Sequence, residues 1–229
     1  MFQSKFIFYY FVLTLFISCD LKNSNAIDTT IDKTITFNIN NVSESINLGD
    51  INNEILFTDI PKTVPYSKEI NKKYADLILK DSIIVMHSFK PHYIPIDKIN
   101  WEEDPENNNT WKLYYENLFF VSILNHVFYE SKDIKYHDKA KKYIISYINK
   151  HESLEQSTSN YSWYDHSAAF RTLHLLQAIT NELNLPNPDL DFIELTFNHI
   201  DVLIDYMLDP KNYRAHNHSI MMDRSLLYL

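Results

Sequence analysis

Hydrophobic residues recur at helical spacing through the second half of the chain. One stripe has the spacing i, i+3, i+4, i+7 and i+8 and consists of Ala140, Tyr143, Ile144, Tyr147 and Ile148. This period predicts an amphipathic helix with one buried face. The lysines of the same segment occupy its other face, which we interpret as solvated; they are Lys139, Lys141 and Lys142.

Two more helices are predicted on either side of Asn187-Pro188, a favourable N-cap and first-turn pair. The helix after this pair ends at Asp209-Pro210 and carries a buried face of Phe192, Leu195, His199, Val202, Leu203 and Tyr206. His199 on that face is interpreted as a satisfied core histidine. The helix before the pair runs from Trp163 to about Leu183, capped by Asn160 or Ser162.

The segment from Trp111 to about Tyr129 is apolar on nearly every side and predicts one heavily buried helix, capped by Asn109-Thr110. A last helix begins near His216 and runs to the end of the chain. Connections of about 6 to 14 residues predict antiparallel neighbours. Alternation of fully apolar and amphipathic helices predicts two layers, with inner helices buried all round.

The first part of the chain has a different pattern. Residues 20–60 are rich in Asn, Ser, Thr and Asp, and Thr34–Asn40 alternates with period two, which predicts a strand. Ser82–Met86 is a second short β-branched run. The chain is therefore predicted to be mainly α with a short extended or β N-terminal segment.

Composition supports the helical prediction. The 229 residues include one glycine, Gly49, whereas average usage would give about 16. A chain with one glycine contains no dinucleotide-binding loop, P-loop or nucleophile elbow. The formal net charge of −9 argues against a nucleic-acid partner. The three arginines, Arg171, Arg214 and Arg224, all lie in the last third.

The N-terminus has the pattern of a secretory signal. Lys5 precedes an apolar run from Phe6 to Ile17, which is too short to span a bilayer. The only cysteine, Cys19, follows Leu15-Phe16-Ile17-Ser18, a relaxed bacterial lipobox. We therefore expect lipidation at Cys19 and attachment to a bacterial membrane, in the periplasm or at the cell surface. The alternative is a free or buried cysteine after an ordinary signal.

These patterns divide the chain into a signal peptide (1–18), a polar tether with short strands (19–60) and a helical domain (61–229). The sequence stops in an apolar run, Ser225–Leu229, without a cap or a helix breaker. We therefore expect the chain to be a fragment or a truncated reading frame. Such an edge would need a C-terminal partner segment or another chain.

Three segments carry candidate chemistry: Ile99–Trp111, Ser162–Arg171 and His216–Leu227. In this order they resemble the helical N-terminal part of the heparinase II/III-like polysaccharide lyases, which include heparan-sulfate and oligoalginate lyases. The resemblance covers roughly residues 95–229, and its most specific part is the Asn217-His218 pair at a helix start. It implies an incomplete α/α toroid of antiparallel helix pairs, which a β-sandwich follows in the family.

The resemblance also implies β-elimination on an acidic polysaccharide containing uronic acid, with no cofactor. A base removes the C5 proton, and donors must neutralise the neighbouring carboxylate. Asn217 and His218 occupy the family's carboxylate-neutralising positions and are the catalytic candidates. The family's catalytic tyrosine lies well downstream, so this chain alone is expected to be inactive. The candidates for substrate binding are Arg171, His166, Trp163, Tyr164 and Arg214.

Structural alternatives stand beside these roles. Asn217 is equally explained as an N-cap, and Arg171 as a buried partner of Asp165, Glu182 or Asp223. His216-x-His218 is also a spacing for two metal ligands, completed by His166 or Asp165. Within a helix residues i and i+2 point apart, so no metal is predicted. The alternative function is a non-catalytic glycan-binding or structural surface lipoprotein.

Overall fold

The computed structural model describes residues 34–39, 42–47, 60, 64, 66–151, 161–213 and 216–229. The predicted signal peptide, Cys19 and Arg214 lie outside these residues. Strands β1 (Thr34–Ile39) and β2 (Val42–Asn47) form an antiparallel hairpin in which Ile35 lies opposite Ile46. This confirms the strand predicted from period two and adds β2, which was not predicted. The hairpin and the helical unit are separate compact units.

The helical unit begins with two elements that the sequence analysis missed, α2 and β4. Ser67 caps α2 through a hydrogen bond to the Ile70 amide. Strand β3, in the predicted β-branched run, pairs with β4 in a two-residue antiparallel ladder. The elements of this unit are α2 (Lys68–Ile78), β3 (Ser82–Ile83), β4 (His92–Tyr93), α3 (Asn109–Glu116), α4 (Phe119–Ser131), α5 (Ile134–Lys150), α6 (Asp165–Leu183), α7 (Leu190–Leu208) and α8 (Asn217–Leu226).

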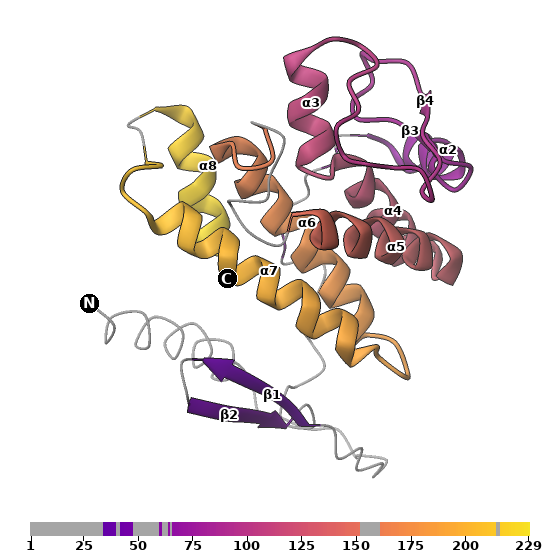
Figure 1. Ribbon diagram of the computed structural model, residues 1–229. Coiled ribbons are helices and arrows are strands. Elements are labelled where there is room, and N and C mark those ends of the chain that lie inside the picture. Colours follow the sequence, from indigo (N-terminus) through magenta and orange to yellow (C-terminus); the bar gives the residue numbers. More distant parts are fainter. Residues whose placement is uncertain are drawn as a thin grey trace. The chain divides into compact units, whose positions relative to one another are not determined.

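Helices α4 and α6 form the inner layer. They pack against each other, while α2 and α5 pack on α4, and α7 and α8 pack on α6 (Figure 1). Every residue of α4 from Phe119 to Phe128 is buried. In α5 the predicted stripe is buried and is extended by Tyr136 and His137. The two-layer arrangement of buried and amphipathic helices is thus confirmed.

The helix predicted over 111–129 is in fact two helices, α3 and α4. The break falls at Leu118, whose φ of 61° lies in the left-handed region. A break leaves carbonyl groups without intrahelical partners. Side chains of α6 supply donors there: Arg171 donates to the Glu116 carbonyl at 2.8 Å, and His174 Nδ1 to the Asn117 carbonyl at 2.7 Å.

Four helix ends differ from the prediction. Asn108, and not Asn109-Thr110, caps α3 by accepting from the amides of Thr110 and Trp111. Asp189, and not Asn187, caps α7 by accepting from the Phe192 amide. Tyr164 precedes α6 without a side-chain cap, and α8 ends at Leu226. His199 is buried as predicted, but within the described part of the chain neither of its ring nitrogens has a hydrogen-bond partner.

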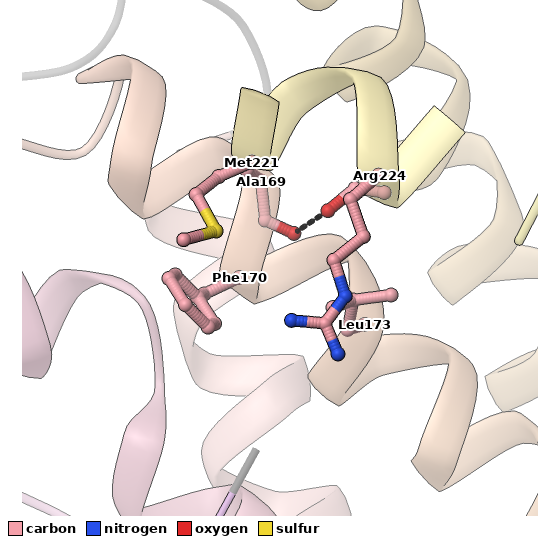
Figure 2. Close-up of a pocket in the computed structure, with 6 residues that line it drawn as sticks. Ala169, Phe170, Leu173, Met221 and Arg224 are labelled. Atoms are coloured by element: carbon pink, nitrogen blue, oxygen red, sulfur yellow. Dashed lines mark hydrogen bonds between the residues drawn. The ribbon is translucent and has the colours of Figure 1, made fainter. Parts of the chain in front are cut away.

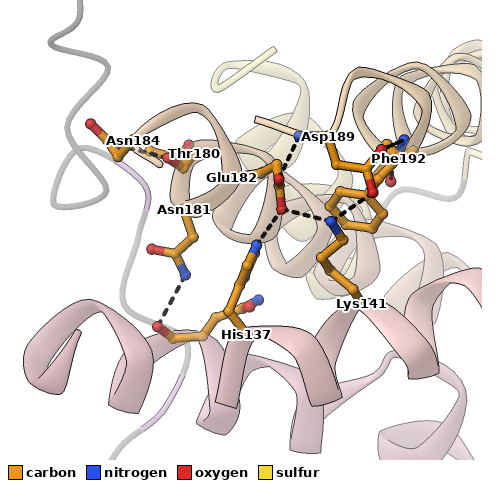
Figure 3. Close-up of polar contacts among 10 residues, drawn as sticks. His137, Lys141, Thr180, Asn181, Glu182, Asn184, Asp189 and Phe192 are labelled. Atoms are coloured by element: carbon orange, nitrogen blue, oxygen red, sulfur yellow. Dashed lines mark hydrogen bonds and ion pairs between the residues drawn. The ribbon is translucent and has the colours of Figure 1, made fainter. Parts of the chain in front are cut away.

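A buried ionic network joins α5, α6 and α7 (Figure 3). Glu182 of α6 contacts His137 Nε2 at 2.6 Å and Lys141 Nζ at 3.1 Å, and it accepts from the Asp189 amide at 2.6 Å. Burial alone would raise the pKa of Glu182, but these hydrogen bonds lower it below its usual value. The network therefore holds a charged carboxylate inside the helical array. None of the described helices is both long and apolar enough to cross a membrane.

Candidate functional site at the starts of helices α6 and α8

The second and third motifs meet in space, although about fifty residues separate them in sequence. Helix α6 starts at Asp165 and α8 starts at Asn217, and the two helices pack against each other. Their first turns are joined by a contact between Asp165 Oδ1 and His218 Nδ1 at 3.1 Å. The structure therefore gathers two of the three motifs into one cluster.

Two further imidazole rings lie beside the His218 ring of this contact. The His166 ring stacks on His218 with centroids 5.0 Å apart, and the His216 ring meets His218 edge-on at 4.6 Å. His216 Nε2 lies 3.9 Å from the second oxygen of Asp165. Tyr164, which is exposed, lies 5.9 Å from His218. The cluster is thus an acid surrounded by groups that bind anions, protons or metal ions.

His216, and not Asn217, is the N-cap of α8. Its backbone is extended, with φ −148° and ψ −178°, and its Nδ1 accepts from the His218 amide at 3.1 Å. This capping geometry leaves Asn217 in the first turn with its side chain exposed. The amide of Asn217 is therefore open to a ligand, and the interpretation of Asn217 as a cap is wrong.

The electrostatics at this end of the two helices favour anions. Helix N-termini carry partial positive charge and unpaired N–H groups. Asp165 is buried and offsets part of that charge. Burial lowers the pKa of His166, and the neighbouring His218 lowers it further. His166 is therefore biased toward its neutral form, which can either donate or accept a hydrogen bond.

Arg171 lies elsewhere than predicted. It is completely buried, and its guanidinium donates to the carbonyls of Glu116 and Ser162 at 2.8 and 2.7 Å. It also lies over the Tyr147 ring at 4.9 Å. Contact with substrate is thus a wrong prediction for Arg171. It is buried, as the structural alternative held, but its hydrogen-bond partners are backbone carbonyls and not the side chains of Asp165, Glu182 or Asp223.

Trp163 is half-buried and packs with part of its ring against α7. Its ring lies 5.7 Å from Tyr206 and 6.1 Å from His199, both on α7, and its indole nitrogen is buried. Tyr164 is the more exposed aromatic residue of this motif, and stacking of Trp163 on a sugar ring stays a prediction. The two tryptophans of the first motif, Trp101 and Trp111, are core residues.

A shallow pocket lies further along the same two helices (Figure 2). The volume in it that could hold a water molecule is about 0 Å³, and Ser225 donates across it to the Ala169 carbonyl at 2.7 Å. Typical ligand pockets measure roughly 300–1,000 Å³. The hydrogen bond and the small volume indicate helix packing, so the exposed cluster remains the better candidate site.

Asp165 and His216 are site residues that the sequence analysis did not select. Both were named only as metal or ion-pair alternatives. Their position in the sequence could have identified them, because each is adjacent to a selected residue at the start of a helix. Helix starts that pack together bring their flanking residues into contact. The sequence did not show that α6 and α8 pack together, so the contact between the two motifs was not predicted.

Comparison with solved structures identifies the fold. Heparan sulfate lyase HepC from Pedobacter heparinus aligns with a TM-score of 0.58 and 16% identity over 71% of this chain and 26% of the enzyme. A mutant of the same enzyme aligns with a TM-score of 0.61 and 17% identity over 73% of this chain and 26% of the enzyme. A heparinase III aligns with a TM-score of 0.59 and 17% identity over 74% of this chain and 29% of that protein.

The protein is therefore mainly α, with the fold of part of a polysaccharide lyase-like helical toroid. The predicted fold class is confirmed. The chain spans little more than a quarter of the length of these enzymes. No family profile and no curated protein sequence matches it.

Proposed function

We propose that this chain is the N-terminal helical part of a polysaccharide lyase that acts by β-elimination on a polysaccharide containing uronic acid. The observation that carries the proposal is the Asp165–His218 cluster at the joined starts of α6 and α8, in a fold shared with heparan sulfate lyases. Asn217 and His218 bind the uronate carboxylate there. Tyr164 and His166 line the same surface.

The chemistry of this role follows from the charges. Removal of the C5 proton puts negative charge beside an ionised carboxylate, so donors must face that group. The exposed Asn217 amide has two N–H donors, and the first-turn backbone amides of α8 add to them. In a chain of net charge −9 such a local site is needed to hold an acidic ligand.

Binding tests this role. In EDTA-treated buffer the chain should bind heparan sulfate or alginate oligosaccharides and not neutral dextran, as measured by calorimetry. Asn217→Ala and His218→Ala should each weaken binding at least fivefold. Asn149→Ala, at an exposed position of α5, is the matched control and should bind normally. Equal binding of dextran, or no loss in the two site variants, contradicts the proposal.

A non-catalytic glycan-binding surface protein is the second candidate. The burial of Arg171 bears on this candidate, because it removes one predicted lyase contact from the surface, whereas Asn217 and Tyr164 remain exposed for binding alone. The lyase proposal assigns the catalytic tyrosine to a region beyond this chain's length, so both candidates expect no cleavage by the chain alone. Unsaturated uronate, detected by its ultraviolet absorbance, would show that this chain carries its own proton-transfer groups.

The proposal includes a lipid anchor at Cys19, which would hold the protein at a bacterial membrane facing its polysaccharide. Labelled palmitate should be incorporated in the producing bacterium, and Cys19→Ser should abolish incorporation and release the protein from the membrane fraction. A Cys19→Ser protein that remains membrane-bound would contradict the anchor.

A further inference from the structure

We infer that Asp165, His216 and His218 form a binding site for a divalent transition-metal ion of the zinc type. One oxygen or nitrogen atom from each of the three side chains lies within 4.8 Å of the other two. The inference goes beyond the proposed saccharide role, because it concerns metal binding in the absence of any glycan.

The distances suit coordination. Zinc bonds of about 2.0–2.1 Å in a tetrahedron place neighbouring ligand atoms about 3.3 Å apart. Asp165 Oδ1 lies 3.1 Å from His218 Nδ1, and Asp165 Oδ2 lies 3.9 Å from His216 Nε2. Small side-chain adjustments therefore bring all three donors to one ion.

The objection from helical geometry does not apply here. Residues i and i+2 point apart inside a helix, but His216 precedes α8 with an extended backbone. Its ring therefore turns back toward His218, with ring centroids 4.6 Å apart. The N-cap position of His216 therefore brings two ligands at i and i+2 to the same side of the helix start.

The donor set selects the class of ion. Two imidazoles and one carboxylate suit zinc and its first-row neighbours, whereas Mg²⁺ and Ca²⁺ prefer oxygen ligands. The His side chains are 37% and 28% exposed and the Asp165 side chain 9% exposed. Three protein ligands with an exposed side leave a coordination position for water or an anionic oxygen.

Binding requires a tautomer change in both histidines. His218 Nδ1 donates to the Asp165 carboxylate, so its proton moves to Nε2 before Nδ1 can coordinate. His216 Nδ1 accepts from the His218 amide, so its neutral ring carries the proton on Nε2. Coordination through Nε2 moves that proton to Nδ1 and breaks the capping hydrogen bond. The released amide is at an exposed helix start where water replaces the acceptor, so the ion competes with this N-cap contact and with the Asp165–His218 hydrogen bond.

His216→Asn separates the two roles of this residue. Asparagine is among the best N-cap residues, so the variant keeps the start of α8 while removing the metal ligand. Asp165→Asn removes the negative charge with little change of shape. His87→Asn, at an exposed histidine outside the cluster, is the matched control.

The test is a Co²⁺ titration of the full chain under reducing conditions, without glycan, followed by visible absorption and then by Zn²⁺ competition. We expect one ion per chain with d–d bands, at least tenfold weaker binding in His216→Asn and Asp165→Asn, and no change in His87→Asn.

Absence of stoichiometric Co²⁺ binding overturns the inference. So does unchanged binding in His216→Asn, or a thiolate charge-transfer band, which places the ion at Cys19. Glycan binding in EDTA is measured separately, so either proposal can fail alone.

Discussion

Arg171 shows how one residue connects three helices. Its guanidinium ties the end of α3 to the segment before α6, through the carbonyls of Glu116 and Ser162, and it lies over a ring of α5. Arginine suits this place because its planar fork donates in two directions at once. A residue predicted to bind substrate is therefore part of the core that positions the site.

Replacing Arg171 with lysine should lower the free energy of unfolding by about 2–4 kcal/mol, because one ammonium cannot reach both buried carbonyls in the same geometry. Urea denaturation measures the change. Arg224→Lys, at an exposed arginine of α8, should stay within about 0.5 kcal/mol of the parent chain. Equal effects of the two substitutions would show that the Arg171 hydrogen bonds contribute little.

At the scale of elements, the break between α3 and α4 separates what the sequence predicts from what it does not. Apolar periodicity over 111–129 correctly predicts a buried helical segment. It does not predict Leu118 at positive φ, because the carbonyls exposed there are satisfied by Arg171 and His174 of α6. Those donors come from more than fifty residues away. The same limit applies to the site, where each motif was visible but the Asp165–His218 contact was not.

The end of α4 supplies a local prediction. Lys132 closes the helix with φ 58° and ψ 16°, a conformation that favours glycine. Lys132→Gly should raise the free energy of unfolding by about 0.5–1 kcal/mol, measured by urea denaturation. Lys132→Ala keeps the unfavourable conformation and loses the ammonium that lies 4.4 Å from the Tyr129 ring. It should therefore be no more stable than the parent, and a gain equal to that of glycine would contradict the explanation.

The ionic network supplies a prediction for helix–helix packing. Glu182→Gln keeps the shape of the side chain but leaves His137 and Lys141 without their buried carboxylate (Figure 3). We expect a loss of about 2–4 kcal/mol in the free energy of unfolding, because the buried His137 loses its carboxylate partner, whereas Lys141 keeps its ion pair with Asp189. Glu194→Gln on the exposed face of α7 is the control, with a change of less than about 0.5 kcal/mol expected. Similar stabilities of the two variants in chemical denaturation would refute a structural role for the network.

At the scale of the whole molecule, buried histidines make the fold sensitive to acid. Burial lowers the pKa of His151 to about 4 and that of His174 to about 3, and it holds the pKa of His199 well below its usual value. An unfolded histidine titrates near 6.5. Between these values the unfolded chain binds protons that the folded chain does not, so stability is full above about pH 6.5 and falls as the pH drops.

Each such histidine should remove about 1 kcal/mol of stability between pH 7.5 and pH 5.5, an interval above the carboxylate titrations. His174→Asn tests the assignment, because the asparagine amide replaces the Nδ1 donor to the Asn117 carbonyl and does not titrate. The variant starts less stable, but its loss between the two pH values should be smaller than the parent's by about that amount. His87→Asn, at an exposed position, should show the parent's full loss. Urea denaturation at both pH values measures these differences, and an identical pH dependence of His174→Asn and the parent would mean that His174 does not stay neutral in the fold.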